Sequence, residues 1–368
     1  MPRELEPRAQ RPTGVIGTPN VDILTHSERA FHPRLEGGKQ PFATPEAAIR
    51  HIIRSRIAYP LEEVASSPAG NTTNVSNAFD ILRRPNDGAV IPVITVGRDG
   101  HTETLRNAPV FRDAQITEYD GPNAVGIIVT SEANTDRTIA SIKPEEIPGG
   151  FNYEGPTLGA IYLTSVGGKD WSKTYAQVTD YKRLHGADTL LAVSPGSLQL
   201  AEKGPELYDA IKQADILLGN KEEALDLIGE GPNSHLSMHE ILIRTQELGA
   251  NLVYVTDGKE GAYAIEGNTV YHMPPFAPKE LQTKPHKNTL GAGDSASAAF
   301  AKAILEGLPV REAMRRAAFN PSSVIREEDA HSGQLDYIAM EDLSANHPEF
   351  QPTVTILKTD VFFAGAQA

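Results

Sequence analysis

An aspartate that follows two glycines and opens a run of small residues is the feature of this sequence that most clearly suggests chemistry. It lies in "NTLGAGDSASAAFAKAIL", residues 288–305, where Gly291 and Gly293 precede Asp294. Glycines let the backbone turn tightly with its N–H groups exposed, and the start of a helix adds the positive end of its dipole. Such a start binds phosphate, and it stabilises the charge that builds up during phosphoryl transfer.

Asp294 needs its own explanation, because a carboxylate beside a bound phosphate would repel it. One interpretation is a general base that takes the proton of an attacking hydroxyl. Another is a cap that only starts the helix. The same letters also fit the dinucleotide fingerprint G-x-G-x-x-A, with Ala296 at the last position. However, the preceding "LQTKPHKN" is polar and broken by a proline where that motif requires a strand.

A scaffold of alternating strands and helices must position these residues. Short apolar runs rich in Val, Ile and Leu predict buried strands at 89–97, 124–130, 159–164, 188–194, 214–219 and 251–257. Helical segments are predicted at 71–83, 171–185, 221–229, 238–249, 294–306 and 309–319. This alternation indicates an α/β fold with a mostly parallel sheet covered on both faces.

Composition limits the partners. The chain of 368 residues has a net charge of −14, which argues against nucleic acid and against an anionic membrane surface, because both favour basic patches. It has no cysteine, so disulfides and thiolate metal sites are excluded. No signal-peptide pattern opens the chain and no apolar run is long enough to span a bilayer. We therefore expect a cytoplasmic protein.

Six ordered segments give the chain a resemblance to a known family. They are "AGNTTNVSNAF" (69–79), "VITVGRDG" (93–100), "NTDRTI" (134–139), "LLGNKEEALDLIG" (217–229), "VTDGKEGAYAI" (255–265) and "TLGAGDS" (289–295). In order and spacing they resemble the signatures of the ribokinase (PfkB) family of sugar and nucleoside kinases, over about residues 13–330. The resemblance implies a ribokinase-like three-layer α/β/α sandwich with a small β lid.

The resemblance also implies the roles of individual residues. Asp294 would be the base, with the amides of Gly291, Ala292 and Gly293 as an anion hole. Asn220 and Glu223 would hold the water shell of Mg²⁺ near the phosphates of ATP, without direct metal ligation, although the same pair would also form a helix capping box. The remaining implied contacts are Thr256, Gly258 and Gly261 with the nucleotide, and Asp22, Gly70, Asn74 and Arg137 with the substrate.

Asn74 is expected to use its amide as both donor and acceptor toward sugar hydroxyls. Arg137, reaching in from the lid, would clamp a phosphate, or it would be an exposed strand arginine. The sequence departs from the family at Asn288, where an aspartate is usual. The effect of this change on nucleotide affinity or on a monovalent-cation site stays open.

The sequence thus predicts an ATP-dependent carbohydrate kinase that phosphorylates a hydroxymethyl group. A nucleoside kinase is the first alternative, and an NAD-binding oxidoreductase or a catalytically silent kinase-fold binding protein are alternatives of other classes. The kinase domain is expected over 1–335, with lid elements from about 26–68 and 100–155. A tail at 336–368 would pack on the same domain. A homodimer formed through the lid is a further expectation.

Overall fold

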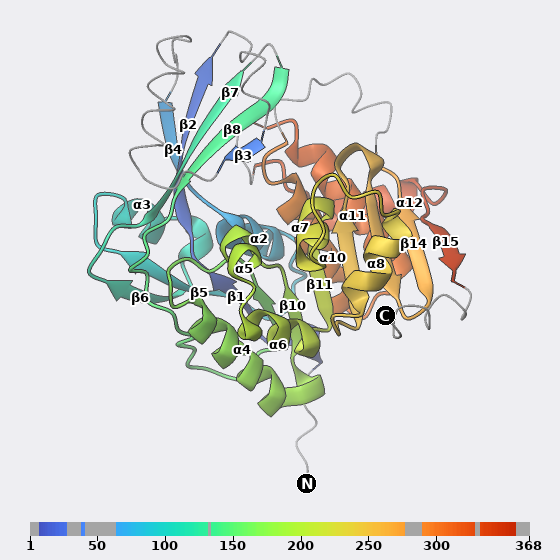
Figure 1. The fold of residues 1–368 in the computed structure, drawn as a ribbon, viewed down its shortest axis with the longest axis horizontal. Coiled ribbons are helices and arrows are strands. Elements are labelled where there is room, and N and C mark those ends of the chain that lie inside the picture. The colour runs from blue at the N-terminus through green and yellow to red at the C-terminus, as the bar shows by residue number, and fades with distance from the viewer. Residues whose placement is uncertain are drawn as a thin grey trace.

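The computed structural model describes residues 7–27, 38–40, 64–131, 134–276, 289–327 and 332–357. Side chains are described throughout these stretches except at 23–27, 38–40, 64–67, 127–131 and 134–142. Figure 1 shows a larger body of strands and helices, from which a smaller sheet projects at the top.

A ten-stranded sheet forms the middle of the larger body. Its strands are β1 (Thr13–Gly17), β5 (Val90–Gly97), β6 (Gln115–Tyr119), β9 (Ala160–Leu163), β10 (Leu190–Val193), β11 (Ile216–Asn220), β12 (Leu252–Thr256), β13 (Ala262–Glu266), β14 (Thr269–Met273) and β15 (Thr353–Ile356). The spatial order is β15-β14-β13-β12-β11-β10-β9-β1-β5-β6. Neighbours from β12 to β6 are parallel, and β13, β14 and β15 extend the sheet in antiparallel fashion.

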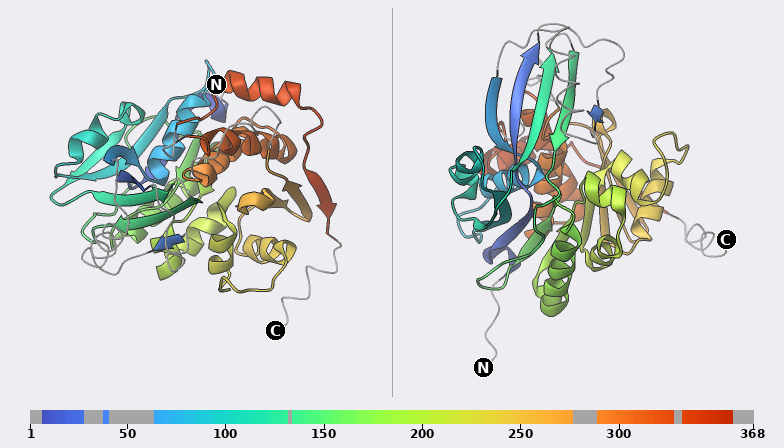
Figure 2. Two further views of the ribbon diagram at one scale, coloured as in Figure 1. Left: turned by 90° about the horizontal axis from the view of Figure 1, so that it is seen from above. Right: turned by 60° about the vertical axis from the view of Figure 1, so that its left-hand side comes forward.

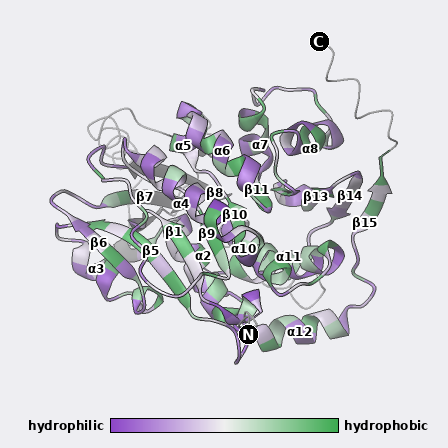
Figure 3. Ribbon diagram, turned by 90° about the horizontal axis from the view of Figure 1, so that it is seen from below, coloured by the Kyte–Doolittle hydropathy of each residue, from purple (hydrophilic) through white to green (hydrophobic). Residues whose placement is uncertain are grey.

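Helices cover both faces of this sheet. The described helices are α2 (Asn71–Ile81), α3 (Thr102–Arg106), α4 (Trp171–His185), α5 (Ser197–Glu202), α6 (Pro205–Gln213), α7 (Lys221–Leu227), α8 (Met238–Gln246), α10 (Ala292–Leu305), α11 (Val310–Val324) and α12 (Tyr337–Asn346). One hydrophobic core joins the sheet to α4, α6, α7 and α8, and another joins it to α2, α10 and α11. In Figure 3 the hydrophobic residues gather on the strands between these helices.

Strand β9 shows why two cores form. Its side chains alternate between the faces of the sheet, so Ile161 and Leu163 join the first core while Ala160 and Tyr162 join the second. All four residues are buried, as a strand covered on both faces requires. The three-layer α/β/α arrangement predicted from the sequence is confirmed.

The smaller sheet has five described strands, in the order β3-β8-β7-β2-β4. They are β2 (Asn20–Ser27), β3 (Gly38–Gln40), β4 (Val64–Ala69), β7 (Ala124–Ser131) and β8 (Asn134–Ile142). The right-hand view of Figure 2 shows this sheet standing away from the larger body. Strand β2 follows β1 after two residues, and β4 leads through Gly70 into α2, so both connections lie at one edge of the larger sheet.

The predicted elements can be compared with the described ones. Each predicted strand and helix is present, with ends that differ by three residues or fewer, except that α11 continues five residues beyond the predicted end. The predicted strand at 124–130 is β7 and belongs to the smaller sheet, because it pairs with β2 and β8. Within the predicted lid range 100–155, β6 instead pairs with β5 in the larger sheet. The division of the chain into a kinase domain and a tail stays a prediction.

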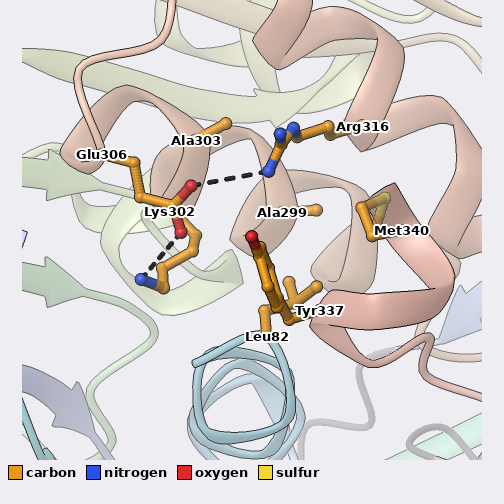
Figure 4. A pocket seen from close by; sticks show the side chains of 8 residues that line it. All are labelled: Leu82, Ala299, Lys302, Ala303, Glu306, Arg316, Tyr337 and Met340. Carbon is orange, nitrogen blue, oxygen red and sulfur yellow. Dashed lines mark ion pairs between the residues drawn. The ribbon is translucent and has the colours of Figure 1, made fainter. Parts of the chain in front are cut away.

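Beyond the predicted kinase domain, α12 contacts α11 and β15 pairs with β14. Under α12 lies a group of charged side chains that we call the Glu306 cluster: Arg84, Lys302, Glu306, Arg316 and Glu341. The Glu306 side chain is only 2% exposed and lies 2.6 Å from Arg84, 3.0 Å from Lys302 and 3.5 Å from Arg316. Figure 4 shows Lys302 and Arg316 directed at Glu306, with Tyr337 and Met340 of α12 beside them.

Replacement of Glu306 tests whether this cluster stabilises the packing of α10, α11 and α12. Glu306→Gln removes the carboxylate that three cations share, while Lys302 keeps its pair with Asp87 and Arg316 keeps its pair with Glu341. We expect the free energy of unfolding in urea to fall by about 2 to 3 kcal/mol. The matched control is Glu341→Gln, whose side chain is 39% exposed and lies 2.5 Å from Arg316. That exchange should cost about 1 kcal/mol or less. Equal losses in the two variants would contradict a special role for Glu306.

Candidate functional site

The candidate site lies at the carboxyl ends of the parallel strands, where the first turns of α2, α7 and α10 meet the sheet. The carboxyl ends of parallel strands share one edge, so residues distant in sequence are collected there. The register of β11 and β12 shows this directly, because Asn220 lies opposite Thr256. The chain segments that follow β1 and β4 also lie at this edge.

The glycine-rich turn forms the start of α10, as the sequence predicts. Gly291 caps the helix in the left-handed conformation, with φ of 72°, which an L side chain rarely adopts. Gly293 is exposed, and a Cβ placed on it would meet open space. The first-turn amides of a helix have no partner four residues earlier within the helix, so this turn offers N–H donors. A ligand can therefore approach the backbone here.

Asp294 lies in the first turn of α10, where its partner comes from α2. The Nδ2 atom of Asn74 donates a hydrogen bond of 2.7 Å to the Asp294 carboxylate, although the residues are 220 positions apart in sequence. Asn74 is 4% exposed, and Asp294 is half-buried. The carboxylate is therefore held at the rim of the anion-binding turn and is not a simple exposed cap. Asn74 was predicted to contact substrate and not this carboxylate.

Tyr162 of β9 is buried near Asp294 and was not predicted. Burial of the phenol, together with the negative charge of Asp294, raises the pKa of Tyr162 well above its usual value. The hydroxyls of Ser194 and Ser297 lie beside it and oppose this rise in its pKa. The phenol therefore stays neutral at every physiological pH. The sequence does not indicate that this tyrosine lies near the site, because it is a single aromatic residue within an apolar strand.

The predicted substrate residues Asp22 and Gly70 meet through Asn20. Asn20 Nδ2 donates to Asp22 Oδ1 at 2.6 Å, and Asp22 is buried. Gly70 has φ of 86°, and a Cβ placed on it would clash with Asn20 Oδ1. A Cβ on Gly126 would likewise clash with Asp22 Oδ1. Asn20 was missed, although a polar residue two positions before Asp22 on a strand falls on the same face.

A lysine at the end of β8 was also missed. Lys143 Nζ donates to Ser165 Oγ at 3.2 Å, and Ser165 follows β9. The Ser165 carbonyl accepts from the amide of Thr18, which follows β1. A positive charge thus lies beside the carboxyl ends of two central strands. No motif marks Lys143 in the sequence.

Asn220 and Glu223 form the capping box that the sequence left as an alternative to Mg²⁺ binding. The Asn220 amide donates to Glu223 Oε2 at 2.9 Å, and the Glu223 amide donates to Asn220 Oδ1 at 2.9 Å. Beside them, Lys221 Nζ lies 3.0 Å from Asp257 Oδ2. The pair is therefore fixed in place at the start of α7, next to the end of β12.

The other predicted nucleotide residues follow β12. Thr256 ends the strand, and Gly258 and Gly261 flank a short turn with φ of 49° and 89°. Gly258 faces open space, while a Cβ on Gly261 would clash with the carbonyl of Met273. The structure therefore brings Asn220, Glu223 and Thr256 together and places the two glycines on the adjoining turn.

Some predicted residues lie outside the described part. Arg137 belongs to β8, but its side chain is not described, and Asn288 and the polar segment 281–288 also fall outside it. Among the described residues, no group of His, Asp and Glu side chains has the arrangement of a direct metal site. No described helix has the length and apolar character needed to cross a bilayer.

Comparison with known proteins places this geometry in a family. Residues 58–333 match the family described as pfkB family carbohydrate kinase. The ribokinase of Lactococcus lactis is 26% identical over 345 residues, which cover 87% of this chain and 92% of that protein. The 5-dehydro-2-deoxygluconokinase of Bacillus licheniformis is 24% identical over 266 residues, or 71% and 74% of the two chains.

A solved structure shares the fold. The adenosine kinase of Sinorhizobium meliloti superposes with a TM-score of 0.67 at 17% sequence identity. The superposition covers 92% of this chain and 100% of that one. At that identity the likeness concerns the fold alone. The family match spans most of the chain and includes the first turns of α2, α7 and α10. The chain belongs to the pfkB family of carbohydrate kinases.

Proposed function

We propose that this protein transfers the terminal phosphoryl group of ATP to a hydroxymethyl group of a sugar, with Asp294 as general base. The observation that carries the proposal is the carboxylate of Asp294 at a glycine-capped helix start, held by a buried amide from another helix. A base beside an anion-binding turn serves a reaction in which a hydroxyl attacks a phosphoryl group.

The reaction is a single in-line displacement. Asp294 takes the proton of the sugar hydroxyl as its oxygen bonds to the terminal phosphorus, and the bond from that phosphorus to the bridging oxygen of ADP breaks. The amides of residues 291–294 stabilise the charge on the transferred group. No covalent enzyme intermediate is needed. Closure of the smaller sheet excludes water, which would otherwise compete as acceptor.

The nucleotide lies over the ends of β11 and β12. Thr256, Gly258 and Gly261 line its path, and the open space at Gly258 and Gly293 leaves room for it. Asn220 and Glu223 supply amide and carboxylate oxygens, the groups that hold the water shell of Mg²⁺. Mg²⁺ neutralises phosphate charge when bound. Within the capping box, both side chains keep a fixed direction for this task.

The sugar lies between the smaller sheet and the anion-binding turn. Asp22, Gly70, Asn74 and Arg137 contact it, and Asn20 orients Asp22. A sugar acceptor is favoured over a nucleoside because both curated relatives named above are sugar kinases. We further propose a cytoplasmic enzyme that dimerises through the smaller sheet. We also propose a monovalent cation beside the anion-binding turn. Asn288, which replaces the aspartate usual in the family, is the residue expected to affect that site.

The base assignment is tested by Asp294→Asn. An amide cannot take the proton, so we expect kcat to fall about 10² to 10⁴-fold while ATP binding is retained. ADP release coupled to a sugar acceptor measures kcat, and calorimetry measures ATP binding. The matched control is Asp180→Asn on α4, where Asp180 is 73% exposed and pairs with Arg183. Unchanged turnover in Asp294→Asn would refute the assignment.

The role of Glu223 is tested by an exchange that keeps the capping box. Glutamine at the third helical position still accepts from the cap amide but carries no charge. We expect Glu223→Gln to raise the Mg²⁺ concentration at half-maximal rate about tenfold or more, with the melting temperature unchanged.

The control is the capping box at the start of α8, in which Glu240 Oε2 accepts from the Ser237 amide at 2.7 Å. Glu240→Gln makes the same exchange at the start of α8 and should leave the Mg²⁺ dependence as it is. If both variants behave alike, Glu223 serves only the helix.

The substrate pocket is tested at Gly70. Gly70→Ala places a Cβ against Asn20, so we expect KM for the sugar to rise about tenfold as one charge-linked hydrogen bond is displaced. Gly229→Ala is the control, since Gly229 has φ of 78° but open space around it. Both variants place alanine at positive φ, which should cost about 1 to 3 kcal/mol in unfolding experiments. A sugar KM that rises equally in both would show that the pocket lies elsewhere.

A further inference from the structure

The bond between Asn74 and Asp294 links the first turns of two helices of the candidate site. Asn74 lies in the first turn of α2, which follows the smaller sheet, and Asp294 lies in the first turn of α10, which forms the anion-binding turn. The bond is 2.7 Å long and Asn74 is buried. A short bond between a buried amide and a carboxylate fixes the direction of both side chains.

The chemistry of the contact settles which end of the amide faces the carboxylate. An amide oxygen and a carboxylate oxygen are both acceptors, so only the NH₂ group of Asn74 can face Asp294. Its Oδ1 atom is then directed elsewhere. That oxygen is buried and accepts no hydrogen bond from any residue in the described part of the chain. A buried acceptor without a partner is costly, so it indicates a donor that arrives with a ligand.

The first turn of α2 holds Asn74 in place from the other side. The backbone N–H of Asn74 donates to the Gly70 carbonyl at 3.0 Å, and Thr73 Oγ1 donates to the Ala69 carbonyl at 2.6 Å. Ala69 is the last residue of β4, so this turn is tied to the smaller sheet. The position of Asn74 therefore depends on where the end of β4 lies relative to α10.

We propose that Asn74 is a positioning residue: its NH₂ group orients the Asp294 carboxylate, and its Oδ1 accepts a hydrogen bond from a second substrate hydroxyl. This proposal rests on the proposed kinase function and deepens it. One N–H of the NH₂ group is used by Asp294, and the buried atom that lacks a partner is Oδ1, which is an acceptor. The acceptor sugar must therefore carry an O–H donor close to the reacting hydroxymethyl group, and a ring oxygen or carbonyl oxygen at that place will not serve.

Tyr162 and Glu223 are two further ionisable residues at this end of the sheet. Tyr162 from β9 is neutral, while Glu223 from α7 carries a negative charge that, like that of Asp294, acts on Tyr162. Negative charge nearby favours protonation of Asp294, and a donated amide hydrogen opposes it. Loss of the Asn74 amide should therefore move the titration of Asp294 to higher pH.

The first arm of the test needs no turnover. The ¹³C carboxyl signal of Asp294, assigned by its absence in Asp294→Asn, is titrated in the wild-type protein, Asn74→Ala and Asn74→Asp. We expect the midpoint to rise in Asn74→Ala. In Asn74→Asp it should rise further, because two carboxylates at this distance share one proton. The control is Asn77→Asp, one turn further along α2 with a partly exposed side chain, which should shift the midpoint much less.

The second arm uses the sugar that the enzyme accepts as substrate. It also uses a deoxy analogue of that sugar, which lacks the hydroxyl proposed to donate to Asn74 Oδ1. In Asn74→Ala we expect kcat to fall about 10 to 100-fold and the acidic limb of the pH–rate profile to move to higher pH, with KM for ATP unchanged. For the wild-type enzyme, kcat/KM should be about tenfold lower with the deoxy analogue than with the full sugar. This difference should vanish in Asn74→Ala.

The two arms separate the possible failures. An Asp294 titration that is the same in wild-type and Asn74→Ala overturns the positioning role, whatever the enzyme phosphorylates. A preference for the full sugar that persists in Asn74→Ala overturns the hydroxyl contact alone. If the first arm succeeds and no sugar is phosphorylated, the proposed function and the hydroxyl contact both fail, while the coupling between α2 and α10 stands.

Discussion

A single hydrogen bond between the first turns of α2 and α10 organises the candidate site. It requires that two helices 220 residues apart in sequence lie on the same face of the sheet with their N-termini at the same edge. Neither helix is a crossover after a parallel strand: α2 begins after β4 of the smaller sheet, and α10 comes after β14, an antiparallel strand of the larger sheet. Packing against the same face of the larger sheet therefore places their first turns together. Both helices share one hydrophobic core, and the small residues of α10 allow close packing on the sheet beneath it.

The same constraint explains how the other site residues come together. Asn220 and Thr256 end neighbouring strands in register, so the start of α7 and the turn after β12 are adjacent. The chain leaves the larger sheet between β1 and β2 and returns to it between β4 and α2. Both connections lie at this edge, so Asn20 contacts Asp22 and lies against Gly70. Polar groups from the smaller sheet thus lie at the carboxyl edge of the larger sheet. In the proposed function, the helix starts on the larger sheet serve phosphoryl transfer, and residues of the smaller sheet serve substrate selection.

The sequence could predict what depends on short-range pattern. The apolar runs at 159–164 and 251–257 and the glycine pair before Asp294 mark strands and a helix start, since propensity and periodicity act locally. The contact of Asn74 with Asp294 could not be predicted, because nothing local distinguishes an asparagine that faces substrate from one that faces a carboxylate. Tyr162 was hidden in the same way inside a buried strand. The strand β7 shows the complementary limit: its apolar pattern predicts burial but does not say in which sheet.

The most direct test of the account is a screen of ADP release by the full chain with ATP and Mg²⁺, over sugars, sugar acids, sugar phosphates and nucleosides. The account predicts sustained ADP release with at least one sugar acceptor that bears a hydroxymethyl group, and a phosphorylated sugar formed in equal amount. Release with nucleosides alone would overturn the sugar assignment. No release with any acceptor, while ATP still binds, would contradict a catalytic role for Asp294 and favour a silent binding protein.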